Sequence, residues 1–134
     1  MKIQLAACGS VAMALGLLTH AVIADEKPAP AAAKAAILMT KDLPELPGKE
    51  AVMLTVEYPP GASFKPHRHN SHVFVYVLEG SFATQVAGGE RVVLEPGETF
   101  YELPSDEHVV SANASDTAPA KILVFMLKDK DAPK

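Results

Sequence analysis

Residues 51–127 are divided into short apolar segments by turn-forming residues at even intervals. The segments are rich in Val, Phe, Tyr, Leu and Thr, which favour strands. Turn-forming residues such as Gly88-Gly89 and Pro96-Gly97 interrupt them. No segment in this range has the length and 3.6-residue period of an amphipathic helix. Many short strands at this spacing predict an all-β fold, either an antiparallel sandwich or a closed barrel.

The strand pattern can be placed residue by residue. We expect the ordered part to begin with a strand near residues 37–40. Residues 73–78 and 122–127 are apolar at nearly every position, so both faces of these two strands should be covered. The second of these belongs to an expected strand over 120–127, and the other expected strands lie at 51–58, 65–69, 81–86, 91–94, 99–103 and 109–113.

The N-terminus has the pattern of a secretory signal peptide. Lys2 is followed by an apolar run over residues 3–18, and small residues up to Ala24 precede the acidic Asp25. We therefore expect a signal peptide over residues 1–24 and a periplasmic or secreted protein. An uncleaved anchor is the alternative, but the run is short for a membrane span. The Leu-Ala-Ala-Cys sequence that ends at Cys8 resembles a lipoprotein box, but most of the apolar run follows the cysteine.

Cleavage after Ala24 removes Cys8, the one cysteine of the chain, so neither a disulfide nor a thiolate ligand is expected. Residues 25–36 are rich in Pro and Ala and are expected to form a linker, although 31–37 could form a short helix. The folded domain is expected over residues 37–128, followed by a charged, flexible tail over 129–134.

The charge balance limits the partners of this chain. The formal net charge is −4, and loss of Lys2 with the signal peptide makes it −5. A mildly acidic chain without a basic run argues against nucleic acid and against an anionic membrane surface as partners. A small-molecule ligand or substrate is the partner that we expect.

The histidines predict a metal site. His67 and His69 are two positions apart, so on a strand both imidazoles leave the same face. His108, in the segment that follows Pro96-Gly97-Glu98, could bring a third imidazole from a distant part of the chain. The alternative is a pair of solvent-facing strand histidines and an unrelated loop histidine.

These residues resemble the two signature motifs of the cupin family. The first motif runs over residues 61–80, and the longer form of the second runs from Pro96 through Pro104 to His108. The resemblance implies a single small barrel of the double-stranded β-helix, or jelly-roll, type. It also implies one divalent metal bound by His67, His69 and His108, and a homodimer.

The glutamate of the first cupin motif is missing, because its position is occupied by Val73. His72 could replace it if a bulge after Asn70-Ser71 shifts the phase of the strand. Glu102, six residues before His108, is a second candidate, and water is a third. Such a site suits Fe, Mn, Ni, Cu or Zn. Arg68, between two of the ligands, is expected to point away from the metal, toward Glu79 or a dimer partner.

Two functions remain open at this stage. The resemblance favours a dioxygenase-like oxidoreductase that acts on a small organic molecule, with Glu102 as the acid/base, although Glu102 could also be an ordinary solvent-facing carboxylate. The alternative is a non-catalytic periplasmic module that binds a metal or a small ligand, which the missing glutamate favours. Fold alone does not decide between them.

Overall fold

A computed structural model describes residues 29–132, which contain strands and no helix. The expected signal peptide and Cys8 lie outside these residues. No helix with the length and apolarity of a membrane span occurs between residues 29 and 132. The strands are β1 (Lys34–Asp42), β2 (Lys49–Tyr58), β3 (Ser63–Phe64), β4 (His72–Glu79), β5 (Phe82–Val86), β6 (Val92–Leu94), β7 (Thr99–Glu102), β8 (His108–Asn113) and β9 (Ala120–Asp129).

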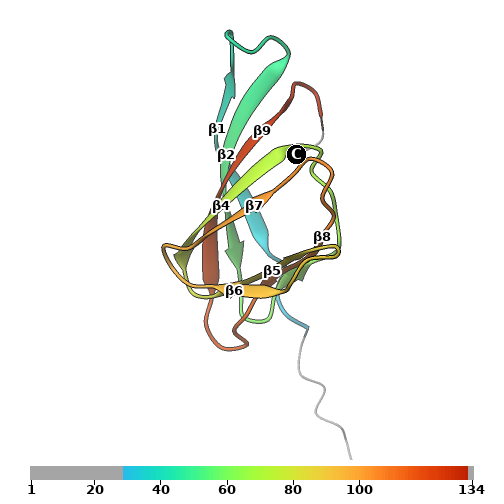
Figure 1. The fold of residues 1–134 in the computed structure, drawn as a ribbon. Coiled ribbons are helices and arrows are strands. Elements are labelled where there is room, and N and C mark those ends of the chain that lie inside the picture. The colour runs from blue at the N-terminus through green and yellow to red at the C-terminus, as the bar shows by residue number, and fades with distance from the viewer. Residues whose placement is uncertain (1–28, 133–134) are drawn as a thin grey trace, which may run out of the picture.

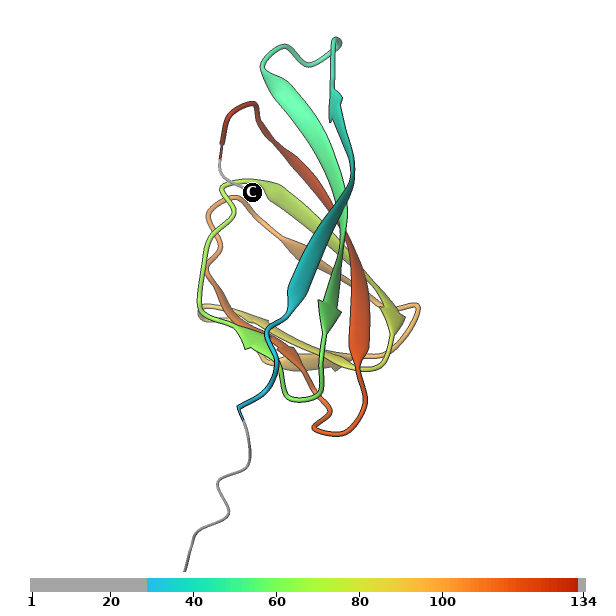
Figure 2. The same ribbon diagram turned by 180° about the vertical axis from the view of Figure 1, so that it is seen from behind.

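The strands form two sheets that enclose one core. The first sheet has five strands in the order β1-β2-β9-β4-β7, and the second has four in the order β3-β8-β5-β6. All of the pairings within the sheets are antiparallel. Figures 1 and 2 show the two sheets facing each other, with the β1–β2 hairpin extending beyond the rest of the barrel. The predicted all-β barrel is confirmed.

Alternation along the strands places the core between the sheets. On β2, Val52, Val56 and Tyr58 are buried and belong to the core cluster. On β4 and β9 every second side chain points inward in the same way. Burial of these side chains supplies the main driving force for folding. The inward residues of the two strands that belong to the core cluster are Val73, Val75, Val77, Ala120, Ile122, Val124 and Met126.

Gly80 ends β4 in a conformation that a larger residue would not tolerate. Its φ angle is 68°, and an added Cβ would collide with the carbonyl oxygen of Pro119. The glycine that closes the first motif is therefore required by a close backbone approach as well as by its dihedral angle.

Some segments differ from the sequence-based expectation. Residues 65–69 do not form a full strand: β3 ends at Phe64, and only His67 makes an isolated bridge further on. Pro66 has no amide hydrogen to donate, which limits regular pairing in this segment. β1 begins at Lys34, so residues 34–37 are extended and not helical. At the C-terminus, β9 continues to Asp129, and Lys130 forms an ion pair with Asp42.

The expectation that both faces of residues 73–78 would be covered is not met within one chain. The outward side chains of β4, which are Phe74, Tyr76 and Leu78, are exposed. Leu123 and Phe125 on β9 are half-buried. The sheet therefore has an apolar outer face.

Candidate metal centre

His67 and His108 are brought together by a reciprocal pair of backbone hydrogen bonds. The amide of His67 donates to the carbonyl of His108 at 3.1 Å, and the amide of His108 donates to the carbonyl of His67 at 2.9 Å. Directly opposed residues of an antiparallel pair project their side chains to the same side. This bridge places the two imidazoles next to each other, with ring centroids 5.2 Å apart.

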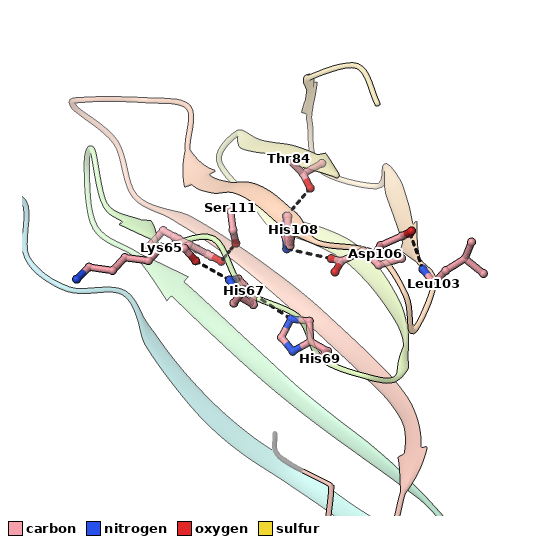
Figure 3. Close-up of polar contacts among 10 residues, drawn as sticks. Lys65, His67, His69, Thr84, Leu103, Asp106, His108 and Ser111 are labelled. Atoms are coloured by element: carbon pink, nitrogen blue, oxygen red, sulfur yellow. Dashed lines mark hydrogen bonds and ion pairs between the residues drawn. The ribbon is translucent and has the colours of Figure 1, made fainter. Parts of the chain in front are cut away.

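His69 completes a group of three imidazoles (Figure 3). One ring nitrogen from each of His67, His69 and His108 lies within 4.8 Å of the other two. Asn70 follows with a φ of 51°, which turns the chain toward β4 immediately after the last of the two motif-one histidines. The structure therefore brings the three histidines together, as the sequence predicts.

The donor atoms of His67 and His69 have the spacing that a metal ion requires. Nδ1 of His67 contacts the carbonyl oxygen of Lys65 at 2.7 Å. Because a carbonyl only accepts, Nδ1 carries the hydrogen and Nε2 keeps its lone pair. That Nε2 lies 3.1 Å from Nε2 of His69. Two nitrogens at about 2.1 Å from one ion would lie roughly 3.0–3.4 Å apart for right-angle to tetrahedral geometry. The residues therefore fit a bound transition metal.

Glu102 and Thr84 hold the ring of His108 from two sides. Oε1 of Glu102 is 3.1 Å from Nδ1, and Oγ1 of Thr84 is 2.8 Å from Nε2. All three side chains are buried. A buried carboxylate that contacts a metal-ligating histidine fixes the ring orientation and raises the basicity of the ring. Glu102 is therefore placed to orient His108, while the three-histidine group itself is defined without it.

Burial sets the charge state of the site. Burial, followed by the neighbouring His67 and His69, lowers the pKa of His108 to about 4. Burial and the nearby His67 also lower the pKa of His69 to about 4. These rings are neutral at pH 7, so each keeps one lone pair that can bind a cation. On His108 the nitrogen that bears it also contacts Thr84 or Glu102. Burial and then Asp106 raise the pKa of Glu102 to about 7, so this carboxyl exchanges a proton near neutral pH.

Aromatic rings surround the histidines. The ring of Phe100 stacks on His108 at 6.4 Å, and Phe82 approaches the same imidazole edge-on at 6.5 Å. Phe64 contacts His67 edge-on at 6.1 Å. This apolar wall lowers the local dielectric constant, which strengthens electrostatic interactions in the site.

His72 lies on the other side of the sheet. Its Nδ1 is 2.6 Å from the hydroxyl of Tyr101, and the two rings stack with an interplanar angle of 13°. The register places His72 opposite Leu127 and Val73 opposite Met126 without a shift, so no bulge turns His72 inward. His72 is consequently not among the histidines that the fold brings together, and the predicted role of His72 as a metal ligand is not supported by this geometry.

Arg68 links the loops that carry the ligands. Its guanidinium donates to the carbonyl of Ser105 and lies 3.0 Å from Oε2 of Glu107, next to His108 in sequence. The partner of Arg68 within the chain is Glu107 and not Glu79. The contact joins the loop of His67 and His69 to the loop that leads into β8.

Sequence reasoning did not identify Thr84. The signal was present, because Phe82 and Thr84 alternate on β5 and both are fully buried. A buried threonine needs a hydrogen-bond partner, which here is His108.

Comparisons with known proteins agree with this architecture. The family model described as "Cupin domain" matches residues 54–126. A search of the curated proteins found no match.

Several solved structures share the fold at low sequence identity. An uncharacterised Klebsiella pneumoniae protein with a double-stranded β-helix domain is 17% identical, with a TM-score of 0.60, over 80% of this chain and 85% of that one. A cupin domain from Bordetella pertussis is 19% identical, with a TM-score of 0.58, over 76% of this chain and 99% of that one.

A DMSP lyase from Ruegeria pomeroyi is 19% identical, with a TM-score of 0.56, over 62% of this chain. The match spans only 41% of that lyase. At these identities the likeness concerns the fold. The match of the family model over more than half of the residues, on a barrel with three converging histidines, shows that the chain belongs to the cupin family.

Proposed function

We propose that this cupin binds one divalent transition metal through His67, His69 and His108 and carries out dioxygenase-like chemistry on a small organic molecule. The observation that carries the proposal is the group of three ring nitrogens within 4.8 Å of one another. Three imidazoles leave coordination positions free on Fe, Mn, Ni, Cu or Zn. A metal in such a site supplies Lewis acidity and, where it is redox-active, a route to oxygen chemistry.

The residues around the site would handle the substrate and its proton. His67 and His69 are half-exposed, so a small molecule can approach them from solvent, whereas His108 is buried behind them. Glu102 contacts His108 and has a pKa near neutrality, so it is suited to accept a proton from a substrate and to release it. The apolar wall of Phe64, Phe82 and Phe100 favours the ring or carbon chain of an organic molecule.

A non-catalytic module that binds a metal or a small ligand is the second candidate. It is favoured by Val73, which occupies the position of the motif glutamate and is buried without any ligand atom. The likeness to a DMSP lyase does not favour either candidate, because at 19% identity it concerns the fold alone. The reaction therefore has to be tested directly.

The test is to measure bound metal in the purified protein and then oxygen consumption with catechols, flavonols and thiols. His108→Ala is the negative variant, and Glu90→Gln, which changes an exposed carboxylate outside the three-histidine group, is the matched control. The proposal expects metal in the protein and in the control, and oxygen uptake that the His108 variant lacks. A metal-loaded protein that is inert toward all three substrate classes supports the binding module. A protein that takes up none of the five metals overturns the metal centre and, with it, the first candidate and the metal-binding form of the second.

We also propose that the protein acts in the periplasm or as a secreted protein. The support is the basic start, apolar run and small residues over residues 1–24. N-terminal sequencing of the protein from its natural compartment is expected to begin at Asp25. A protein that retains Met1 or Lys2 in the cytoplasm would contradict export.

A further inference from the structure

His72 and Tyr101 form a hydrogen-bonded pair on the outer face of the five-stranded sheet. The register aligns Tyr101 with Phe74, two residues from His72, so His72 and Tyr101 are diagonal neighbours on the same face. Nδ1 of His72 lies 2.6 Å from the hydroxyl oxygen of Tyr101. The two rings are nearly parallel, with an interplanar angle of 13° and centroids 6.1 Å apart. Two different strands therefore hold the pair in place, outside the three-histidine group.

The proton of this hydrogen bond belongs to the phenol. A neutral imidazole has one nitrogen that donates and one that accepts, whereas a tyrosine hydroxyl can do either. Because a phenol is a much stronger acid than a neutral imidazole N–H, the hydroxyl of Tyr101 donates and Nδ1 of His72 accepts. The distance of 2.6 Å is short for a hydrogen bond between oxygen and nitrogen. The proton can therefore cross it without a rearrangement of either side chain.

A tyrosine in this arrangement can lose an electron and a proton together. Removal of one electron makes the hydroxyl of a phenol a very strong acid, so the proton leaves with the electron. We propose that Tyr101 is a redox-active tyrosine and that His72 accepts its phenolic proton. The electron passes to a one-electron oxidant, the O–H bond breaks and an N–H bond forms at Nδ1. Tyr101 becomes a neutral phenoxyl radical, and His72 becomes a histidinium.

The neighbours of Tyr101 on the outer face agree with this role. The ring of Phe74 packs against the ring of Tyr101 at 5.0 Å, and Phe74 in turn contacts Phe125 at 6.0 Å. These apolar rings have no group that can accept a proton, so His72 is the base in contact with the phenol. A base that is already within hydrogen-bond reach needs no search through solvent before it takes the proton.

The backbone connects Tyr101 to the candidate metal centre. On β7, Tyr101 lies between Phe100, whose ring stacks on His108 at 6.4 Å, and Glu102, whose Oε1 is 3.1 Å from Nδ1 of His108. Successive side chains of a strand point to opposite faces, so Tyr101 lies on the outside of the strand that makes these two contacts. The chemical class of oxidant that this placement suits is an oxidised transition metal in that centre, and in this respect the inference rests on the proposed function.

Tyr76 provides a matched comparison within the same protein. Tyr76 and Tyr101 are both 44% exposed, and both lie on the outer face. Within residues 29–132 the hydroxyl of Tyr76 makes no hydrogen bond. The third tyrosine of the chain, Tyr58, is 2% exposed, and its hydroxyl contacts the hydroxyl of Ser111, which is not a base. If His72 promotes the oxidation, Tyr101 should react before the other two tyrosines.

The test is the oxidation of the purified, metal-free protein by hexachloroiridate(IV), followed by stopped-flow absorbance and by EPR of frozen samples. The expected product is a tyrosyl radical that Tyr101→Phe abolishes and Tyr76→Phe preserves. His72→Phe keeps an aromatic ring but removes the base, so the oxidation is expected to slow roughly tenfold or more. The unsubstituted protein should react more slowly in heavy water than in ordinary water, and His72→Phe should lose this dependence.

His72→Gln separates the loss of the base from the loss of the hydrogen bond. Its amide oxygen can accept the hydrogen bond of Tyr101 but is a far weaker base than imidazole, so this variant should react as slowly as His72→Phe. A radical that persists in Tyr101→Phe, or an unchanged oxidation rate in both His72 variants, overturns the proposal. Because the measurement uses metal-free protein, a failure to bind metal would overturn the proposed function and leave this result unchanged.

Discussion

Val73 on β4 and Glu102 on β7 lie directly opposite each other, and both side chains point into the barrel. Their exposed fractions are 1% and 3%, and the register pairs them without a shift. The first cupin motif expects a glutamate where Val73 stands. In this chain the carboxylate comes from the neighbouring strand and reaches His108 at 3.1 Å. The carboxylate is thus displaced by one strand within the same layer of the barrel.

This displacement predicts that the two side chains can be exchanged. Glu102→Val alone is expected to weaken metal binding roughly 10- to 100-fold, because His108 loses the carboxylate that orients it. Adding Val73→Glu should recover much of the affinity, since the new carboxylate enters the same inner layer. Competition with a coloured chelator measures both. An unchanged affinity in the Glu102→Val protein would remove Glu102 from the site.

His108→Ala is expected to lower metal occupancy and the unfolding temperature together. A metal that binds only the folded protein stabilises it by about 2.7 kcal/mol at a hundred times its dissociation constant. Metal analysis and thermal unfolding, with and without added metal, measure this linkage. The control is His72→Ala, whose ring contacts Tyr101 on the outer face and should leave occupancy intact. Full metal content in the His108 variant would contradict the proposed ligand set.

The stability of the metal-free protein should fall as the pH falls from 6.5 to 4.5. The lowered pKa values of His69 and His108, each about 4, mean that the unfolded chain binds these two protons first. The pKa of Glu102, raised to about 7, acts in the opposite direction, because the folded protein binds that proton first. The net difference is one proton, or about 1.4 kcal/mol per pH unit.

The same balance predicts the behaviour of Glu102→Gln. This variant loses the opposing contribution, so two protons remain and the slope should double to about 2.7 kcal/mol per pH unit. Urea unfolding at several pH values in the presence of a chelator gives both slopes. Equal slopes in the two proteins would show that the Glu102 carboxyl does not hold its proton in the folded state.

Arg68→Gln is expected to weaken metal binding a few-fold with little loss of stability. The side chains of Arg68 and Glu107 are 52% and 40% exposed, and such pairs contribute about 1 kcal/mol or less. Their contact nevertheless joins the two loops that carry the ligands, so the site should become less rigid. Calorimetric titration and thermal unfolding separate the two effects. A large drop in unfolding temperature would indicate a structural role instead.

The sequence was sufficient for the fold because its local patterns agree with one another. Alternation in β2, β4 and β9, with turn residues between them, located these strands to within a few residues. The same reasoning failed at residues 65–69, where proline and a single bridge replace a regular strand. It also missed that β1 begins at Lys34, because an Ala-rich stretch has no strand pattern of its own and pairs with β2 through tertiary context.

The sequence predicts only those site residues whose spacing along the chain determines where their side chains lie. His67 and His69 followed from their separation, and His108 from the second motif. The orientation of His72 depended on a bulge that the strand does not have, which no single residue reveals. Thr84 and the contact between Glu102 and His108 depend on which strands become neighbours, and this is a property of the whole barrel.

The bridge between His67 and His108 determines when, during folding, the three imidazoles come together. Its two hydrogen bonds join segments that meet only when β8 has taken its place in the finished barrel. A nascent or partly assembled chain cannot present the three imidazoles as a set. Under the proposed metal-binding function, loading would therefore come last, and the ion would be selected from whatever the surroundings offer where the chain completes its assembly.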